Sequence, residues 1–332
     1  MKKIPIVSII VLNWNGKSWL EECLSSIYKQ SFRNFEVILA DNNSSDDSIE
    51  YTKKNWPGVK ILKLSKDFGY AGGNNRAART ARGEFILFLT NDVKIPKSFL
   101  KELYTVAKEK KTILFCPRML NYNGKEVFPK DKKYSGMGKY GYPIPAKQPF
   151  YVDGAALFME KSVFEELGGF DEDYFMFQED VDLSWRARLL GYKIVPLESA
   201  KIFHFGGGTV VGSRKNNGRH KTSTLRRYHT EKNALSNLLK NYEFKNIIYV
   251  IPVFLILGWG EAFLYLLTGQ VSGSIAILRA HLWNLINLGK ILAKRRKIQK
   301  TRKVSDKEIL KHISRGSGKW KVFKSMGVPK LN

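Results

Sequence analysis

The amino-acid sequence predicts an α/β fold with a mostly parallel central sheet flanked by helices. Within the first 90 residues, short apolar runs rich in β-branched side chains alternate with segments of helical spacing. Such runs are typical of strands buried on both faces, and strand–helix alternation favours a parallel sheet. The chain has 332 residues, of which 43% are hydrophobic, and this is enough for a large core.

The expected elements follow one another closely as far as residue 104. Strands are expected over residues 6–12, 35–40, 59–64 and 85–89, helices over 18–30, 48–55, 74–82 and 96–104, and long surface loops over 121–149 and 206–220. Asn13, Asp41 and Asp92 follow the ends of three of the strands. Because ligands of parallel α/β sheets bind at the carboxyl ends of the strands, we expect these three side chains to line one cleft.

A cluster of carboxylates later in the chain is the strongest sign of chemistry. Glu179, Asp180 and Asp182 lie within four positions, with aromatic residues before them and Arg186 after them. Carboxylates so close together repel one another, and burial raises their pKa unless a cation or donor compensates. A fold that tolerates such a cluster typically uses it to hold a metal or to abstract a proton. The alternative is a solvated acidic turn that caps a helix.

The C-terminal third has the pattern of a membrane-associated segment. Residues 247–268 contain a single charge, Glu261, and are long enough to cross a bilayer. Residues 271–293 repeat apolar side chains at helical spacing, which indicates an amphipathic interfacial helix. A re-entrant or hairpin-like insertion agrees with the positive-inside rule better than a single crossing does. The alternative is an ordinary pair of buried helices.

The charge of the chain indicates a polyanionic partner. The formal net charge is +26, and residues 279–332 contain 16 Lys or Arg against two acidic residues. Nucleic acid and the anionic face of a membrane both attract such a segment. The apolar residues 247–268 favour the membrane, so we expect no nucleic-acid partner. The N-terminus has no secretory pattern and the two cysteines have no metal-type spacing, which favours a cytoplasmic location.

Six segments follow one another in an order that is specific when they are taken together. They are Val7–Asn13, Asp41–Asp46, Gly69–Asn75, Thr90–Asp92, Gly168–Glu172 and Glu179–Leu183. They resemble glycosyltransferase family 2, in particular its rhamnosyltransferase-like branch, over roughly residues 5–240. The resemblance implies a GT-A-type nucleotide-diphospho-sugar transferase fold and inverting sugar transfer, usually with a divalent metal, Mg²⁺ or Mn²⁺. Two departures stand out: residues 90–92 lack the first aspartate of the metal motif, and Asp67 stands where many relatives have asparagine.

The resemblance also implies roles for individual residues. Spacing leaves open whether Glu179 or Asp180 points inward, and the resemblance favours Asp180 as the general base for the acceptor hydroxyl. Asp92 and His204 are the expected metal ligands. Donor or nucleotide binding is expected of Asn13, Asp41, Asn43, Gly69, Gly73, Asn74 and Asn91, and acceptor-side or supporting roles of Asp153, Gly154, Asp182 and Arg227.

Several of these assignments have a structural alternative. Asp92 can cap the helix that follows it, and His204 can be an ordinary core histidine. Asp41 can serve only to form a turn, and Arg227 can belong to a solvated basic helix face. Of Glu179 and Asp182, one is expected to position the acceptor and the other to pair with Arg186 or to cap the helix.

The sequence therefore predicts an inverting glycosyltransferase that moves a sugar from a nucleotide-diphosphate donor, such as dTDP-rhamnose or a UDP-sugar, to a hydroxyl of a lipid-linked or cell-surface glycan. Its expected partners are the donor, a glycan or polyprenyl-linked acceptor and an anionic membrane surface. We expect a catalytic domain over residues 1–240, membrane-associated helices over 241–295 and a basic tail over 296–332. Residues 247–293 would hold it at the cytoplasmic face of the cell membrane. The alternative is a catalytically silent membrane-bound protein that binds a glycan or a nucleotide.

Overall fold

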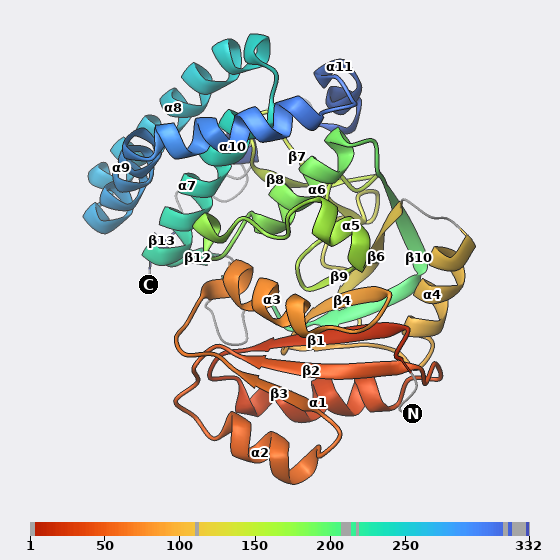
Figure 1. Ribbon diagram of the computed structural model, residues 1–332. Coiled ribbons are helices and arrows are strands. Elements are labelled where there is room, and N and C mark those ends of the chain that lie inside the picture. Colours follow the sequence, from red (N-terminus) through yellow and green to blue (C-terminus); the bar gives the residue numbers. More distant parts are fainter. Residues whose placement is uncertain are drawn as a thin grey trace.

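The computed structural model describes residues 4–109, 113–206, 214–216, 219–314, 318–320 and 330–331. Its centre is an eight-stranded sheet (Figure 1). The strands of this sheet, in spatial order, are β3 (Lys60–Lys63), β2 (Phe35–Asp41), β1 (Val7–Asn13), β4 (Phe85–Thr90), β9 (Ala156–Glu160), β6 (Ile113–Asn121), β10 (Lys193–His204) and β5 (Val93–Lys94).

The first half of this sheet is parallel, as predicted. β1 pairs in parallel with β2 and with β4, so that Asn13 lies beside Asp41. β9, however, runs antiparallel to β4 and β6, and β5 runs antiparallel to β10. β6 and β10 again pair in parallel, so six of the eight strands run in one direction and the sheet is mixed through β9 and β5. The reversal of β9 was not expected; no crossover helix lies between β6 and β9, and neighbouring parallel strands require a crossover.

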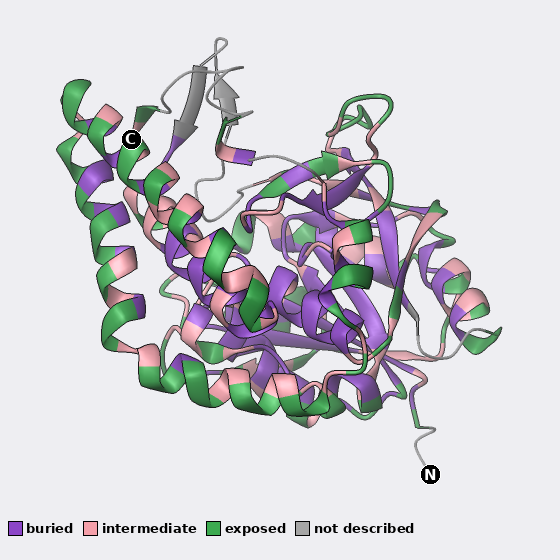
Figure 2. Cartoon of the chain, turned by 90° about the horizontal axis from the view of Figure 1, so that it is seen from above, coloured by how far each residue is buried: buried purple, intermediate pink, exposed green. Residues whose placement is uncertain are grey.

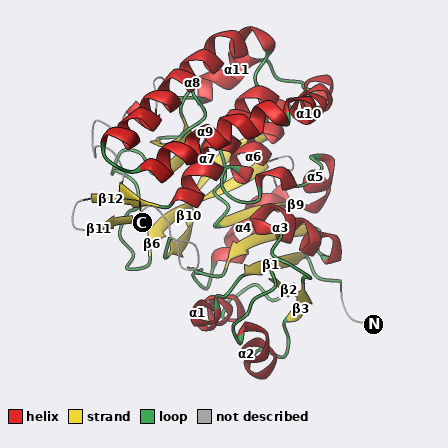
Figure 3. Cartoon of the chain, turned by 90° about the vertical axis from the view of Figure 1, so that its left-hand side faces the viewer, coloured by secondary structure: helices red, strands yellow, loops and turns green. Residues whose placement is uncertain are grey.

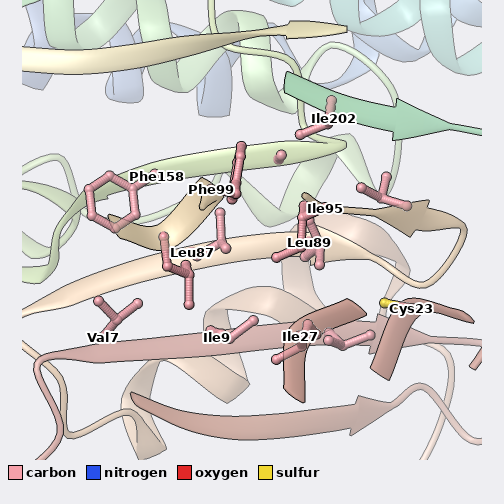
Figure 4. Packing of buried hydrophobic residues seen from close by; sticks show 14 of the residues in the cluster. Val7, Ile9, Cys23, Ile27, Leu87, Leu89, Ile95, Phe99, Phe158 and Ile202 are labelled. Atoms are coloured by element: carbon pink, nitrogen blue, oxygen red, sulfur yellow. The ribbon is translucent and has the colours of Figure 1, made fainter. Parts of the chain in front are cut away.

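Helices cover both faces of the sheet. α1 (Lys17–Tyr28), α2 (Ser48–Asn55) and α4 (Phe99–Glu109) cover one face, and α3 (Gly69–Thr80), α5 (Lys161–Glu166) and α6 (Glu179–Leu189) cover the other. Successive side chains of β1 point to opposite faces of the sheet, as is usual in a strand. Val7, Ile9 and Val11 pack in the cluster with α1, whereas Ile10 packs in the cluster with α3. Figure 4 shows the first cluster, in which Ile27 of α1 lies against β1.

The C-terminal helices lie on the side of the α/β unit away from α1 and α2 (Figures 1 and 3). They are α7 (Thr224–Asn241), α8 (Phe244–Leu267), α9 (Val271–Ile286), α10 (Leu288–Thr301) and the short α11 (Asp306–Ile309), which continues into the 3₁₀ helix η2 (Leu310–His312). The amphipathic helix predicted over residues 271–293 is thus divided between α9 and α10. Trp185 of α6 packs in one core with Tyr242 and Phe254 of this layer. Figure 2 shows the sheet buried and the outer helix faces exposed.

Two predicted loops contain regular structure. Within residues 121–149, β7 (Tyr134–Met137) and β8 (Pro143–Ala146) pair as an antiparallel hairpin, and β7 is buried. The sequence did not reveal β7 because Tyr-Ser-Gly-Met has little of the β-branched character of a strand. The predicted loop over residues 206–220 lies partly outside the described residues. Its described part contributes β11 (Arg214–Asn216) and the start of β12 (Arg219–Thr222) to a small sheet with β13 (Lys330–Leu331).

The glycine-rich segment is the beginning of a helix and not a turn. α3 starts at Gly69, whereas the prediction placed the helix start at Asn74. Gly69 has a φ of 66°, and an added Cβ would lie 2.3 Å from the carbonyl oxygen of Phe175. Asp67 Oδ1 accepts a hydrogen bond from the Gly69 N–H at 2.8 Å. Because it lacks a Cβ, Gly69 lets α3 start close against the segment that precedes α6.

Candidate active site

A row of buried polar side chains connects the carboxyl ends of three neighbouring strands. At the end of β1, Asn13 Nδ2 donates to Asp41 Oδ2 of β2 at 3.0 Å. Asn13 Oδ1 accepts from Asn91 Nδ2, just after β4, at 2.8 Å. Asp41 also accepts hydrogen bonds from the N–H and the hydroxyl of Ser44. It therefore has the turn-forming role that was its structural alternative, in addition to its place in the row. The row ends beside Asp92, the next residue along the chain, so the predicted strand-end residues lie together.

Two glycines make room for this row. An added Cβ at Gly16 would lie 1.9 Å from Asn91 Nδ2, and one at Gly73 would lie 2.5 Å from Leu12 Cδ1. Gly73 therefore allows α3 to pack closely on β1. Gly16 was missed by the sequence analysis, although its position shortly after the first strand was a signal that the backbone there passes close to another group.

The other predicted donor residues lie beside the row and do not extend it. Asn43 is exposed and has a left-handed φ of 62°. Asn74 is buried and donates to the carbonyl oxygen of Tyr70 at 3.0 Å. Asp67 Oδ1 accepts from Asn42 Nδ2 at 2.8 Å. Together with its bond to the start of α3, this contact lets Asp67 tie that helix to the loop after β2, which gives the carboxylate at this position a structural use.

Asp92 and His204 meet at the far end of the row. His204 ends β10 and pairs with Val93, the first residue of β5. His204 Nε2 lies 3.4 Å from Asp92 Oδ1, and Asp92 is buried. Burial alone would lower the pKa of His204, but the hydrogen bond to Asp92 and the charges of Asp92 and Asp153 raise it. The two residues predicted to bind a metal are therefore in contact with each other.

The acidic cluster begins α6 and contains two carboxyls with raised pKa values. Burial and the charge of Asp153 raise the pKa of Asp180 to about 7. Burial and the charge of Asp180 raise the pKa of Glu179 well above its ordinary value. Asp180 Oδ2 accepts from the Gly154 N–H at 3.0 Å, whereas Glu179 Oε2 has no hydrogen-bond partner within the described part of the chain. A carboxyl with a pKa near neutrality is suited to proton transfer at physiological pH.

The charge of Asp153 acts both on the acidic cluster and on the Asp92–His204 pair. Its charge raises the pKa of both Asp180 and His204. Because such an influence weakens with distance, Asp153 lies within electrostatic reach of both groups. Tyr70 also lies near Asp153, since its hydroxyl donates to the Gly154 carbonyl oxygen at 2.6 Å. The sequence analysis did not single out Tyr70, and nothing in its local pattern marks it.

Asp182 belongs instead to a buried ion-pair network. Its carboxylate lies 2.8 Å from Arg186 Nε and 2.9 Å from Lys240 Nζ, so Asp182, and not Glu179, is the residue that pairs with Arg186. Burial would raise the pKa of Asp182, but the charges of Arg186 and Lys240 lower it below its ordinary value. Lys240 also contacts Asp171 at 2.6 Å, and Asp171 contacts Lys294 of α10. The network therefore joins α6, α7 and α10.

Arg227 points into the helix layer. Its guanidinium lies 2.6 Å from Glu261 of α8 and 3.7 Å from Glu231 of α7. Lys319 contacts the same two carboxylates at 2.9 and 2.8 Å. Glu231 and Glu261 are thus both paired inside the protein. Arg227 does not lie on a solvated helix face, which was its structural alternative.

The neighbouring Arg226 is oriented toward the acidic region. Its guanidinium carbon lies 4.6 Å from the centre of the Phe177 ring, in the segment before α6. Burial lowers the pKa of Arg226, while the charges of Asp153 and Asp180 act in the opposite direction. Successive residues of a helix point about 100° apart, so of the two adjacent arginines only one can face this site.

These side chains offer three kinds of chemistry within one region. The buried row can bind a polar group, the Asp92–His204 pair offers two ligands to a cation, and Asp180 can accept a proton. Among the described residues, no group of three or more His, Cys, Asp or Glu side chains could hold a metal. A cation at Asp92 and His204 would therefore need further ligands from a substrate or from water.

The comparison with known families decides what the domain is. Residues 8–168 match the model of glycosyl transferase family 2. This segment is a glycosyltransferase family 2 domain. It contains the buried row and Asp92, whereas Asp180 and His204 lie beyond the matched residues.

Relatives of known function match a larger part of the chain. The chain is 30% identical over 226 residues to the O-antigen biosynthesis protein RfbC of Myxococcus xanthus, which covers 60% of this chain and 17% of that protein. It is also 24% identical over 233 residues to the N-acetylglucosaminyl-diphospho-decaprenol L-rhamnosyltransferase of Mycobacterium tuberculosis. This match covers 60% of this chain and 76% of that protein. The chain thus spans only a small part of the first relative and most of the second.

Solved structures of glycosyltransferases share the fold. The structure of GalNAc-T7 with UDP, GalNAc and Mn²⁺ matches with a TM-score of 0.64 and 16% identity, covering 100% of this chain and 60% of that chain. At this identity the likeness concerns the fold alone. The fold of this glycosyltransferase family 2 domain is GT-A-like, as predicted, with a mixed sheet flanked by helices.

Proposed function

We propose that this protein is an inverting glycosyltransferase that moves a sugar from a nucleotide-diphosphate donor to a hydroxyl of a cell-envelope glycan. The family of residues 8–168 supports sugar transfer, and the names of both relatives refer to envelope glycans. The observation that carries the proposal is the environment of Asp180. This carboxyl has a near-neutral pKa and shares the influence of Asp153 with the Asp92–His204 pair.

Asp180 is the proposed general base. It would remove the proton from the acceptor hydroxyl while that oxygen attacks the anomeric carbon on the side opposite the diphosphate. General bases work best when their pKa lies near the operating pH, and a pKa of about 7 meets this requirement. Burial and the charge of Asp180 raise the pKa of Glu179 well above its ordinary value. Its proposed role is to position the acceptor beside Asp180.

Asp92 and His204 are the proposed ligands of a divalent cation, Mg²⁺ or Mn²⁺. A carboxylate and an imidazole suit Mn²⁺, and Mg²⁺ needs few protein ligands where substrate phosphates supply the others. Because the two side chains lie 3.4 Å apart, their possible metal-ligand atoms are in one place. A bound cation would neutralise the diphosphate leaving group. The likeness to a transferase solved with Mn²⁺ supports this part of the proposal.

The buried row of Asn13, Asp41 and Asn91 is the proposed nucleotide site. A carboxylate at the end of a strand in an α/β sheet commonly contacts a ribose, and Asp41 has this position. We propose dTDP-rhamnose or a UDP-sugar as donor and a polyprenyl-linked glycan as acceptor. The similarity to an L-rhamnosyltransferase named for a decaprenol-linked acceptor supports both choices.

Nucleotide release tests this function directly. The full chain is incubated with Mn²⁺ and a panel of UDP-, dTDP- and GDP-sugars, with water as the acceptor of the sugar and Asp180→Asn as the variant without the base. Asp47→Asn is the matched control because its carboxylate is 77% exposed and pairs only with Lys17 among the described contacts. We expect release from one donor class by the wild type and the control, and none by Asp180→Asn. Donor binding without release from any sugar would instead favour the catalytically silent binding protein.

We further propose that α8 and α9 dock in the plane of an anionic membrane surface. Among the described residues, α8 is the helix long and apolar enough to cross a membrane. One of its faces, however, is buried in the protein along nearly its whole length, from Val250 through Phe254 and Ala262 to Tyr265. A helix that is packed on its own domain in this way can lie along a bilayer and present its opposite face to the lipid. This proposal replaces both the single crossing and the re-entrant insertion.

The opposite faces of α8 and α9 form what we call the apolar surface. Its exposed residues are Ile248, Ile256, Trp259, Phe263, Leu266, Leu267, Val271, Ile275, Leu278, Leu282, Leu285 and Ile286. Exposed basic residues accompany it, namely Lys245, Arg279 and Lys290. An apolar stripe next to basic side chains is the pattern of interfacial helices that bind anionic lipids.

Vesicle flotation tests this docking. The full chain should float with phosphatidylglycerol-containing vesicles and not with phosphatidylcholine alone. Trp259→Glu with Phe263→Glu should weaken binding at least ~100-fold, because each large apolar side chain contributes about 1.5–3 kcal/mol when it leaves water. Val127→Glu, an exposed apolar site elsewhere, is the control. Resistance of the membrane-bound wild type to alkaline carbonate would contradict in-plane docking and favour a crossing.

A further inference from the structure

The segment that leads into α6 has an unusual backbone. Phe175, Phe177 and Gln178 are non-glycine residues with positive φ values of 63°, 65° and 69°. Bulky residues rarely adopt this conformation, and it persists only where the surroundings impose it. Residues 175–178, which we call the entry turn, directly precede Glu179 and Asp180. The orientation of the proposed base therefore depends on what holds the entry turn.

Asn233 of α7 provides most of that hold. Its Nδ2 lies 3.0, 2.9 and 2.7 Å from three backbone carbonyl oxygens, those of Tyr174, Met176 and Phe177. The side chain is only 1% exposed, so water does not compete for these contacts. The two N–H groups of one buried amide are thus shared among three carbonyl groups whose orientation defines the turn.

Neighbouring groups hold the remaining carbonyls of this stretch. The Ala71 N–H of α3 donates to the Phe175 carbonyl oxygen at 3.1 Å. Lys232 Nζ donates to the carbonyl oxygen of Asp173, in the 3₁₀ helix η1 (Glu172–Tyr174). The Gln178 carbonyl oxygen accepts the Asp182 N–H at 3.0 Å, as the first turn of α6 requires. By contrast, α6 has no side-chain cap at its start, so its first residues rely on the entry turn for their direction.

We propose that Asn233 is a positioning residue for the general base. By fixing the entry turn, it sets the start of α6 so that Asp180 accepts the Gly154 N–H and remains in the acidic region. The proposal rests on the proposed function of Asp180. Asn233 itself touches neither the acidic side chains nor the buried row in the described contacts, so it acts through the backbone.

The surroundings of Asp180 make its orientation measurable. The titratable and charged groups that influence it or respond to it come from α6, α3, α7 and the segment before β9. They are Glu179, Tyr70, Arg226, Tyr151 and Asp153. Because burial and Asp153 raise the pKa of Asp180, a carboxyl that turns toward water should return to a lower pKa.

The test compares Asn233→Ala with Asn284→Ala in the full chain. Asn284 is the matched control because it is also a buried amide packed on α7, where it contacts Ser236 Oγ and the Lys232 carbonyl oxygen, and it does not touch the entry turn. We expect Asn233→Ala to lower kcat about 10- to 100-fold with an unchanged KM for the donor, since only the base is displaced. The acid limb of its pH profile should move to lower pH. Asn284→Ala should keep the wild-type profile at a similar loss of thermal stability.

Two outcomes would overturn the positioning role. One is a wild-type pH profile and kcat in Asn233→Ala, and the other is an equal shift in Asn284→Ala. If Asn233→Ala does not fold, Asn237→Ala replaces it, because its amide contacts Gln178 at 3.4 Å and accepts the Tyr174 hydroxyl. An unshifted pH profile in Asn237→Ala would also overturn the positioning role. Full turnover by Asp180→Asn would refute the proposed base itself, whereas loss of turnover there with a normal Asn233→Ala refutes only the positioning.

Discussion

Replacement of Asp180 by Asn should change activity and stability in opposite directions. The carboxyl has a folded-state pKa of about 7 against an ordinary value of 3.8. Between these values the folded protein binds the proton more tightly than the unfolded chain does. The free energy of unfolding therefore falls as pH rises from about 4 to about 7 and stays low above that range.

The magnitude follows from the two pKa values. At about 1.4 kcal/mol per pKa unit, ionisation of Asp180 costs up to about 4 kcal/mol of folding stability at pH 8. Asparagine has the same shape without the charge, so Asp180→Asn should recover much of this amount at pH 8 and none of it at pH 3. Catalysis should fall about 10²–10⁴-fold, the usual contribution of a general base.

Two assays measure these effects. In the nucleotide-release assay, wild-type kcat should be half-maximal near pH 7 and about 100-fold lower at pH 5, where only about 1% of the base is ionised. Urea unfolding at pH 8 and pH 3 gives the stability of the wild type and the variant. A kcat that does not change between pH 5 and pH 8, or a variant less stable than the wild type at pH 8, would refute the assignment of Asp180.

Two further predictions concern the cation and the ion-pair network. Asp92→Ala should weaken donor binding at least ~10-fold in Mn²⁺ but not in EDTA, because the residue acts through the cation; calorimetric titration measures this, and an equal loss under both conditions would contradict the ligand role. Lys240→Met should lower the free energy of unfolding by about 3–5 kcal/mol, because it leaves the buried Asp182 and Asp171 short of a cation. A loss below ~1 kcal/mol in urea unfolding would show that these acids do not depend on Lys240.

The first half of the fold could be predicted because its signals are local. The apolar runs of β1, β2 and β4 identify buried strands, and α2 begins and ends where the sequence indicated, at Ser48 and Asn55. The direction of β9 depends on β4, which lies far away in the chain, whereas β7 pairs with the nearby β8. β7 is buried by its surroundings and not by its own composition. Local propensity carries no information of that kind.

The same distinction applies to the site. Topology alone brings Asn13, Asp41 and Asn91 together, because the carboxyl ends of neighbouring parallel strands lie at one edge. Which of two adjacent helical residues faces the site depends on how the helix is rotated about its axis, and sequence does not reveal that rotation. For this reason the sequence does not distinguish Arg226, which faces the acidic region, from Arg227, which pairs with Glu261.

The role of Asn233 could not be predicted from the local sequence for a similar reason. Its partners are backbone carbonyls more than fifty positions earlier in the chain. Backbone acceptors have no sequence signature, so the sequence around Asn233 does not indicate which groups its amide contacts. The left-handed residues of the entry turn were equally invisible, since phenylalanine and glutamine are not turn-forming residues.

The lysine bridge between Asp182 and Asp171 has a practical consequence. A chain cut before α7 would keep both carboxylates but lose Lys240 and Lys294, and it would uncover Trp185. Heat or denaturant should therefore melt the α/β unit and its helical companion in a single transition. The proposed membrane docking and sugar transfer therefore cannot be separated by truncating the chain. Surface substitutions that leave this ion-pair network intact are the way to study one without the other.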